Sequence, residues 1–338
     1  MEGNCVDMPS EPEGERLKKN IKTTAYPAEI RGGVVWVYMG PKEKQPVLPD
    51  LEWAYLPERQ RTATKRMQMC NWAQAVEGGI DSSHISFLHG ATEAQHKRAA
   101  DQGVVGRNRF NATDRHPVFD VKEVPYGLAI AARRNAEADN YYWRITQFLL
   151  PFHQMIPPVV PERDSSNAPY SGHAWVPIDD ETTWTWTFSA HPKRDFTDQE
   201  REFNGGPEGM WGPIDENFMP KHNAANDYLL DRKLQRELTF TGIKGIPNQD
   251  AAVQESMGRI VPRWKEHVGT SDTAIVRWRS LMLRLARELQ GGKDPDAAKH
   301  GEWYNVRSCA NMLKRDEDWQ EGCRWLTTGG QIPAAAAE

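Results

Sequence analysis

The segment HAWVPIDDETTWTWTFSA, residues 173–190, gives the clearest indication of the fold. On both sides of Asp179-Asp180, β-branched and aromatic residues alternate with polar ones, which predicts two antiparallel strands joined by a turn. The stretch from Gly127 to Phe152, which contains RITQFLLPF at 144–152, alternates in the same way. We therefore expect an antiparallel sheet built from these segments.

A long amphipathic helix is expected after the sheet. Between Thr270 and Gln290, apolar residues recur at steps of 3, 4, 3 and 4, with Ser271 or Asp272 available as a cap and Gly291-Gly292 as a stop. Laid across one face of the sheet, this helix gives an α+β fold. Shorter helices are expected at Leu229–Leu238 and Asp250–Trp264, and residues 294–338 read as a loosely held tail. The apolar positions of the long helix are Ile275, Trp278, Met282, Leu285 and Leu289.

The first part of the chain predicts a separate β-hairpin. Arg31-Gly32-Gly33 lies between two β-prone runs within Thr23–Met39, as expected for a hairpin turn. The proline-containing stretch Gly40–Leu51 reads as a linker. We therefore place a domain boundary near residue 46, which divides the chain into residues 1–46 and 47–338.

Composition excludes several classes of protein. The 338 residues include 42 Lys and Arg against 47 Asp and Glu, a net charge of -5, and no dense basic run, which argues against nucleic acid as a partner. No apolar run approaches the ~20 residues of a membrane-spanning helix, and residues 1–20 are too polar for a secretory signal. We expect a cytoplasmic protein with no membrane contact. Its 4 cysteines lack CxxC spacing, so we expect reduced thiols and no thiol-ligated metal cluster.

The segment with the most chemical content is NWAQAVEGGIDSSHISFLH, residues 71–89. Glu77, Asp81 and His84 fall at i, i+4 and i+7 and share one face if the segment is helical. On an ideal helix His89 would lie about 140° around from His84. Joint metal binding therefore requires a distortion between Ser86 and His89. The alternative is an amphipathic helix that carries two unrelated histidines.

This segment resembles the iron-binding motif of the Rieske non-heme iron oxygenases, particularly the phthalate dioxygenase-like group. Residues 3–14, 23–41, 141–158, 172–181 and 241–279 are similar to that group as well, so the resemblance extends to about residue 288. It implies the helix-grip catalytic domain of ring-hydroxylating oxygenases, assembled as a homotrimer.

The resemblance also implies a set of iron ligands. In that family two histidines and a later aspartate hold a mononuclear Fe(II), and the matching residues are His84, His89 and Asp250. From the residues alone, Asp250 is a carboxylate in the first turn of a helix after Pro247. Asp81 matches the aspartate that links the iron to a neighbouring subunit's cluster. The alternatives for Asp81 are a residue that orients a histidine ligand and an exposed helix-face carboxylate.

The sequence departs from the family at the two-iron Rieske cluster, which Cys-x-His-type pairs ligate. None of the 4 cysteines has a histidine two or three residues later, so the ligands of that cluster are absent. The similarity starts just after the family's second cluster-binding pair. We therefore expect residues 1–46 to be the last strands of a Rieske domain and residues 47–338 to be the catalytic domain, whether through truncation, a misplaced start codon or a split gene.

The activity implied by the resemblance is Fe(II)- and O2-dependent hydroxylation of an aromatic acid, such as a phthalate-like compound, with electrons from an NAD(P)H-dependent reductase. Arg133, Arg134 and Arg144 are candidates to pair the substrate's carboxylate, although surface salt bridges are the simpler explanation for each. Two alternatives remain open. One is a degenerate, non-catalytic ligand-binding relative, and the other is a zinc hydrolase, because two histidines and a carboxylate also suit zinc.

Overall fold

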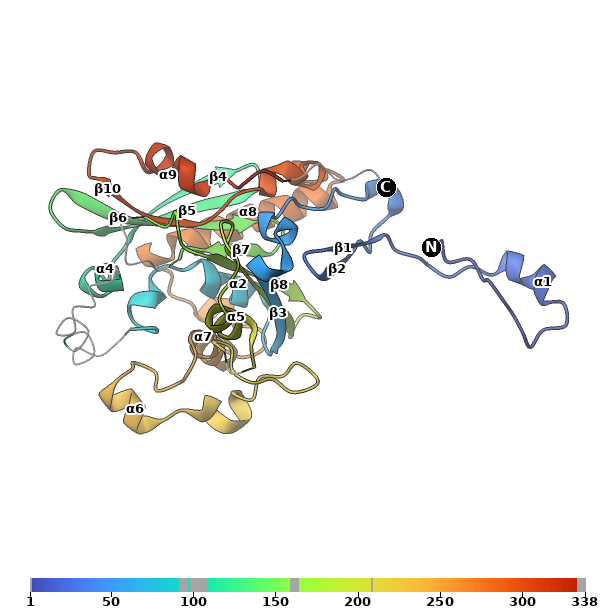
Figure 1. The fold of residues 1–338 in the computed structure, drawn as a ribbon, viewed down its shortest axis with the longest axis horizontal. Helices are drawn as coiled ribbons and strands as arrows, with labels where there is room; N and C mark the ends of the chain where they lie inside the picture. Colours follow the sequence, from blue (N-terminus) through green and yellow to red (C-terminus); the bar gives the residue numbers. More distant parts are fainter. Residues whose placement is uncertain (1, 91–96, 98–107, 159–163, 208, 333–338) are drawn as a thin grey trace.

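The computed structural model describes residues 2–90, 97, 108–158, 164–207 and 209–332. Its centre is an antiparallel sheet in the order β3-β9-β8-β7-β6-β5-β4, and β10 pairs with β6 beyond the end of β7 (Figure 1). The strands are β3 (Arg61–Gln68), β4 (Val118–Val124), β5 (Gly127–Asn135), β6 (Asn140–Leu149), β7 (His153–Ile156), β8 (Tyr170–Pro177), β9 (Thr183–Ala190) and β10 (Cys309–Lys314).

The strands expected from residues 127–152 and 172–190 are confirmed. β8 and β9 form the predicted hairpin, with Val176 opposite Trp184. Asp179 closes its turn, because one carboxylate oxygen accepts hydrogen bonds from the backbone N–H groups of Glu181 at 2.8 Å and Thr182 at 2.7 Å. The hairpin therefore depends both on Asp179 in its turn and on the alternating residues of the two strands.

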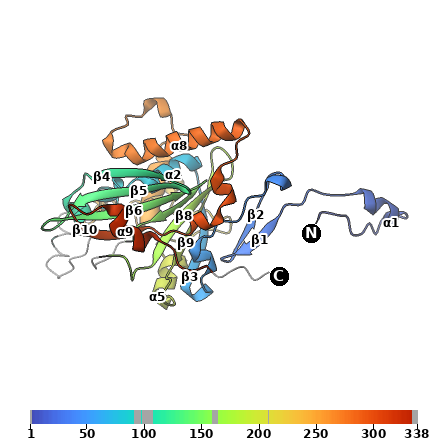
Figure 2. The same ribbon diagram turned by 90° about the horizontal axis from the view of Figure 1, so that it is seen from above.

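The two faces of the sheet are covered by different parts of the chain. One face, which we call the inner face, carries Phe148, Gln154 and His173 in register and is covered by α2 (Trp72–Ile80), α7 (Ile246–Ser256) and α8 (Thr273–Gln290). The other, the outer face, packs against the segment around Trp53 and against α9 (Trp319–Thr327) (Figure 2). The metal-site candidates described below lie on the inner face, together with Arg134 and Arg144, whereas Arg133 lies on the outer face.

The long C-terminal helix is confirmed as α8. Ala274, Trp278 and Leu281 are buried, and the Trp278 ring lies 5.9 Å from the Phe148 ring of the sheet. Gly291 ends the helix as expected. Leu289 is 52 % exposed, so the apolar stripe ends one turn earlier than predicted.

The expected loose tail is wrong for the described residues up to 332. β10 joins the main sheet, and α9 buries Trp319, Cys323 and Leu326 against its outer face. The Trp319 indole N–H also donates a hydrogen bond to the Asp120 carboxylate at 2.8 Å. This segment therefore packs against the core, and the prediction of a loose tail arose from its many charged, exposed residues. Residues 333–338 lie outside the described part of the chain.

The predicted hairpin near the N-terminus is confirmed as β1 (Ala28–Arg31) and β2 (Val34–Val37). Gly32 and Gly33 have positive φ values of 68° and 77°, which a two-residue hairpin turn of this kind requires. The Trp36 ring packs 5.9 Å from His153 of β7, so one face of the hairpin contacts the main sheet.

Two helix boundaries differ from the predictions. The expected helix at 229–238 is confined to α6 (Arg232–Glu237). The one expected at 250–264 runs instead as α7 over 246–256, because Gly245, at φ 82°, starts it earlier and Gly258, at φ 95°, follows its end. Asp250 therefore lies in the second turn of its helix, not the first.

Within the described residues, no helix is both long and apolar enough to cross a membrane. The remaining helices are short. They are α1 (Gly14–Leu17), α4 (Asn108–Thr113), α5 (Asp198–Gly205) and 3₁₀ turns at Lys18–Asn20, Lys42–Lys44, Glu52–Tyr55, Glu58–Gln60, His84–Ser86, Ala224–Leu229, Arg263–Lys265, Thr270–Asp272, Asp296–Lys299 and Gly301–Tyr304.

Candidate metal centre

Helix α2 lies directly against the inner face of the sheet. Asn71 caps its first turn by accepting a hydrogen bond from the Ala73 N–H at 2.9 Å. Gly79 allows the close approach, because a Cβ there would collide with the Trp175 ring and the Gln154 amide of the sheet. The last turn of α2 is thus fixed on the sheet immediately before the histidine segment begins.

The helix ends at Ile80, and Asp81 starts a tight loop. Its carboxylate accepts hydrogen bonds from the backbone N–H groups of Ser83 at 2.7 Å and His84 at 2.9 Å, which turns the chain out of the helix. A 3₁₀ turn over His84–Ser86 follows. The chain does depart from a regular α-helix, as joint metal binding by the two histidines requires, but the helix ends at Ile80, before His84, and not between Ser86 and His89 as predicted.

Because the helix ends early, Glu77 does not share a face with the histidines. Its carboxylate is held instead by Arg279 of α8, at 2.8 and 3.0 Å, and by Arg263 at 2.5 Å. Glu266 completes this group of four charges through both arginines. Glu77 therefore anchors α2 to α8 and takes no part in the metal site.

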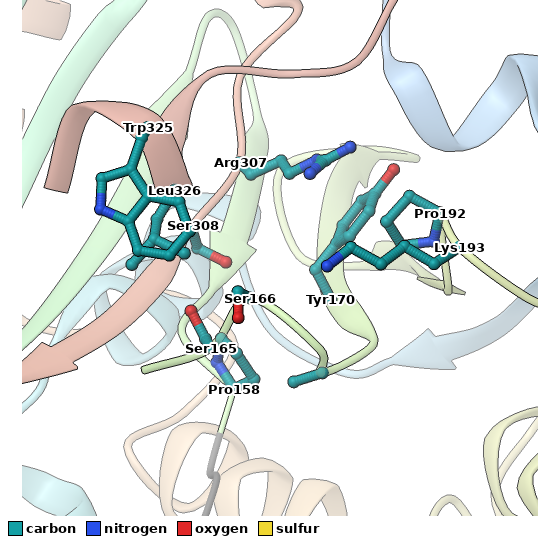
Figure 3. Close-up of a pocket in the computed structure, with 11 residues that line it drawn as sticks. Pro158, Ser165, Ser166, Tyr170, Pro192, Lys193, Arg307, Ser308, Trp325 and Leu326 are labelled. Carbon is teal, nitrogen blue, oxygen red and sulfur yellow. The ribbon is translucent and has the colours of Figure 1, made fainter. Parts of the chain in front are cut away.

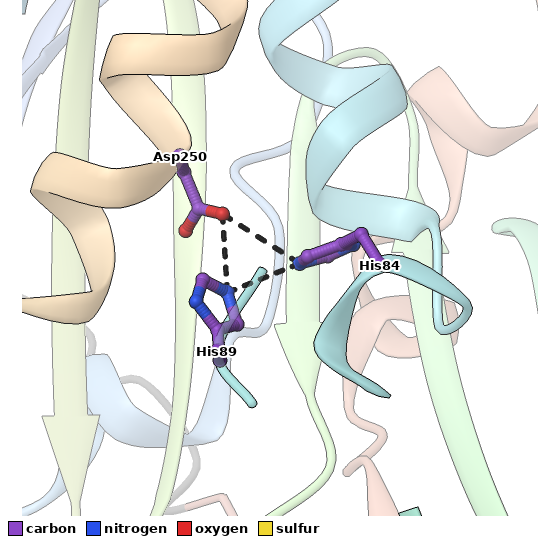
Figure 4. Close-up of side chains that lie close together, drawn as sticks. All are labelled: His84, His89 and Asp250. Atoms are coloured by element: carbon purple, nitrogen blue, oxygen red, sulfur yellow. Dashed lines mark hydrogen bonds and ion pairs between the residues drawn. The ribbon is translucent and has the colours of Figure 1, made fainter. Parts of the chain in front are cut away.

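The loop and α7 bring three donor atoms together (Figure 4). The Nε2 atoms of His84 and His89 are 3.2 Å apart. Asp250 Oδ1 lies 3.1 Å from the His89 nitrogen and 3.6 Å from the His84 nitrogen. The three sequence-predicted ligands thus converge, although about 160 residues separate the histidine loop from α7.

These distances suit a single metal ion. Two donors that each lie ~2.1 Å from one ion, at right angles to each other, are ~3.0 Å apart. The observed triangle is close to that value on two sides and wider on the third. Two imidazoles and one carboxylate are a donor set that suits Fe(II) and also zinc. Among the described residues this is the group of metal-binding side chains that fits one ion.

The charges around the triangle favour ionised carboxylates. Burial raises the pKa of Asp250, but the hydrogen bond with His89 and the nearby His84 outweigh it and leave the pKa below its ordinary value. The pKa of Asp81 is lowered in the same way, because hydrogen bonds from His84 and Ser83 outweigh burial. Both aspartates are therefore anionic at neutral pH.

Each histidine is also held by its second ring nitrogen. Asp81 Oδ2 lies 3.3 Å from His84 Nδ1, and Gln249 Oε1 lies 2.8 Å from His89 Nδ1. Arg66, on β3, fixes the start of α7 by donating to the Pro247 carbonyl at 3.0 Å and to Asn248 at 3.2 Å. The sequence analysis missed Gln249 and Arg66. The available signals were an amide directly before the candidate aspartate and an arginine inside a strand.

The three candidate arginines have different surroundings. Arg134 is buried and holds the histidine loop, donating to the Ser82 carbonyl at 2.5 Å and to Ser86 at 3.3 Å. Arg133 lies over the Tyr141 ring, 4.2 Å from its centroid. Arg144 is buried on the inner face and donates one bond, to the Pro157 carbonyl at 2.9 Å. Its Nε and Nη1 have no hydrogen-bond partner among the described residues.

A cavity of about 150 Å³ lies away from the metal centre (Figure 3). Tyr170 of β8, Arg307, Lys193 and Trp325 are among the residues that line it. Successive side chains of a strand point to opposite faces of the sheet. Tyr170 lies three positions before the inner-face residue His173 on β8 and therefore points to the outer face, where this cavity lies. The sheet therefore separates it from the histidine triangle.

Comparison with known proteins identifies the family. Residues 37–328 match the family described as LigXa C-terminal domain like. The 3-chlorobenzoate-3,4-dioxygenase oxygenase subunit of Comamonas testosteroni is 33% identical over 94% of this chain and 75% of its own length. The phthalate 4,5-dioxygenase oxygenase subunit of Pseudomonas putida is 34% identical over 95% of this chain and 72% of its own.

The fold agrees with this match. A crystal structure of dicamba monooxygenase bound to dicamba aligns with a TM-score of 0.52 at 14% identity, over 86% of this chain and 77% of that one. The predicted α+β fold is thereby confirmed. The curated relatives are named as oxygenase subunits, which favours neither a zinc hydrolase nor a non-catalytic relative. The chain belongs to the LigXa C-terminal domain-like family and is an oxygenase subunit of the ring-hydroxylating class.

Proposed function

We propose that this subunit hydroxylates an aromatic acid with dioxygen at a mononuclear Fe(II) held by His84, His89 and Asp250. The observation that carries the proposal is the triangle of donor atoms, 3.1 to 3.6 Å on a side. Bound at this site, Fe(II) supplies the binding and reductive activation of dioxygen at the positions that three protein ligands leave open.

The protein's own contribution is to hold the donors in place. Asp81 accepts hydrogen bonds from the backbone and the ring of His84, so the loop geometry and the ring orientation depend on one carboxylate. Arg66 ties the first turn of α7 to β3 and thereby fixes Asp250 relative to the sheet. The packed inner face, with Trp175 against α2, keeps water away from one side of the site.

Arg144 is the arginine best suited to the carboxylate of the substrate. It is 4 % exposed, and two of its nitrogens, Nε and Nη1, have no hydrogen-bond acceptor among the described residues. Arg134 lies nearby on the same face, and burial followed by the charge of Arg144 lowers the pKa of Arg134 to about 10. Two close guanidinium groups, one of them with free donors, favour an anion between sheet and metal site. Two relatives, named for 3-chlorobenzoate and phthalate, act on aromatic acids.

The partners follow from the same class of enzyme. We propose that electrons come from an NAD(P)H-dependent reductase, directly or through a ferredoxin, and reach the iron from a two-iron Rieske cluster whose ligands are absent from this sequence. In a homotrimer, Asp81 would carry the route from the neighbouring subunit, which its partly exposed carboxylate permits. We also propose that residues 1–46 belong to the Rieske domain, that residues 47–338 form the catalytic domain, and that the protein is cytoplasmic.

The metal site is tested by analysis of iron, zinc and acid-labile sulfide in protein purified without oxygen. We expect about one iron per chain with no sulfide, lost in both His84→Ala and His89→Ala. His153→Gln is the matched control, because His153 is a buried histidine on the outer face and its loss should leave the iron in place. Zinc instead of iron, or unchanged iron in both alanine variants, would refute the proposal.

The substrate class is tested through Arg144→Met. Loss of one partner of a buried charge pair costs about 2–5 kcal/mol, so the dissociation constant of a benzoate or phthalate should rise roughly 30-fold or more. Arg133→Met, which changes an arginine on the outer face of the neighbouring strand, is the control and should bind normally. Equal affinities in the two variants would remove Arg144 from the substrate site.

A further inference from the structure

We propose that Gln249 is the positioning residue for His89, fixing the ring tautomer that presents Nε2 to the metal. The inference rests on the iron site proposed above and concerns a residue that does not itself touch the metal. Gln249 is 8 % exposed and precedes Asp250 on α7, so one helical segment carries both a ligand and the support of another ligand.

The hydrogen bonds of Gln249 define the direction of its amide. Its Nε2 donates to the Ile243 carbonyl at 2.9 Å, an acceptor that only an N–H can satisfy. The amide oxygen therefore faces His89 and lies 2.8 Å from Nδ1. An amide oxygen can only accept, so Nδ1 must carry the ring proton. The lone pair of His89 is consequently on Nε2, the atom directed at Asp250 and His84.

The two histidines are supported in chemically different ways. Nδ1 of His84 faces the carboxylate of Asp81, at 3.3 Å, whereas Nδ1 of His89 faces a neutral amide at a shorter distance. A carboxylate raises the basicity of an imidazole ligand more than an amide does. Gln249 therefore supplies orientation with little added negative charge, and the charge near the metal comes from Asp81 and Asp250.

The shared helix couples the two contributions. Because the Gln249 and Asp250 side chains both start from the second turn of α7, a shift of the helix would move the carboxylate and release His89 together. Arg66 and the Ile243 carbonyl hold this part of the chain at separate points. The arrangement ties the geometry of two ligands to the docking of one helix.

The experiment measures the Co²⁺ affinity of the full chain by visible absorption. The unsubstituted protein is compared with the variants Gln249→Leu, Gln249→Glu and Gln254→Leu. Loss of the acceptor should weaken Co²⁺ binding roughly 10- to 100-fold in Gln249→Leu and alter its ligand-field bands. Gln249→Glu keeps an acceptor for Nδ1 and should restore affinity to within a few-fold. Gln254 is the matched control, a glutamine of α7 with 7 % exposure that bonds to Gln68 and not to the site.

The outcomes separate this inference from the iron site itself. Co²⁺ binding that survives in His89→Ala refutes the site. Loss of binding in His89→Ala combined with unchanged affinity in Gln249→Leu refutes only the role of Gln249. An equal loss in Gln254→Leu, with a matching fall in melting temperature, would make the effect one of general stability and overturn the proposal. A Gln249→Glu variant as weak as Gln249→Leu would overturn it as well.

Discussion

Replacement of Glu77 by glutamine should destabilise the protein without removing any metal ligand. Glu77 is 7 % exposed and receives three hydrogen bonds from two arginines, at 2.5, 2.8 and 3.0 Å. Glutamine keeps the shape of the side chain but removes its charge and replaces one acceptor oxygen by a donor. The guanidinium groups of Arg263 and Arg279 are then left with Glu266 as their charged partner in this group.

The size of the effect follows from burial. Breaking a buried ion pair costs about 3–5 kcal/mol. The side chains of Arg263 and Arg279 are 36% and 26% exposed and keep Glu266, so water and the remaining carboxylate compensate in part. A hydrogen bond to a charged group contributes about 1.5–3 kcal/mol. We therefore expect the free energy of unfolding to fall by about 2–3 kcal/mol. For a chain of this length that corresponds to a fall of roughly 3–4 °C in melting temperature.

Urea unfolding followed by circular dichroism measures the change, and Arg279→Met completes a double-mutant cycle. A coupling energy of about 1–2 kcal/mol is expected between the two positions, because they share two hydrogen bonds. Glu288→Gln, which changes a partly exposed partner of Arg284 on the same helix α8, should have a much smaller effect. A Glu77→Gln variant as stable as Glu288→Gln, or a coupling energy of zero, would refute the anchoring role.

Three further changes test other parts of the fold. Gly79→Ala should cost about 1–3 kcal/mol by urea unfolding despite alanine's better helix propensity, because its Cβ collides with Trp175. Trp319→Ala should cost about 3–5 kcal/mol in the same assay, which a loosely held tail would not. Burial lowers the pKa of His153 from 6.5 to about 4. As the pH falls below 6.5, His153 is therefore protonated in the unfolded chain while it is still neutral in the folded one. The free energy of unfolding should decrease between pH 6.5 and pH 4 for this reason. Urea midpoints at pH 7 and 5 should show that this fall is smaller in His153→Gln; an unchanged slope would contradict it.

The elements that could be predicted from the sequence are those with local signals. The β8–β9 hairpin has alternation on both sides of Asp179, and α8 has its apolar spacing and a glycine stop. β10 has no such signal, because its sequence CANMLK contains no β-branched or aromatic residue. It becomes a strand by pairing with β6, a contact between segments far apart in the chain. Local propensity does not contain that information.

The candidate site was predictable to a similar degree. The spacing of His84 and His89 indicated that the helix must break, and the structure shows it breaking earlier, at Asp81. Asp250 came from the family resemblance alone, since nothing local joins it to the histidines. The roles of Arg134 and Arg144 could not be separated in sequence, because they depend on which donors the surrounding backbone already occupies.

The division of the ligands between a loop and a distant helix makes the metal a cross-link. A bound ion joins His89 to Asp250 and so closes a loop of about 160 residues. In the folded protein the ends of this loop already lie together, whereas the unfolded chain would lose conformational entropy in bringing them together. Binding energy then adds to the stability of the whole domain, by RT ln(1 + [M]/Kd). Metal supply would thus set the lifetime of this protein as well as its activity, and the metal-free chain would be the form that unfolds first.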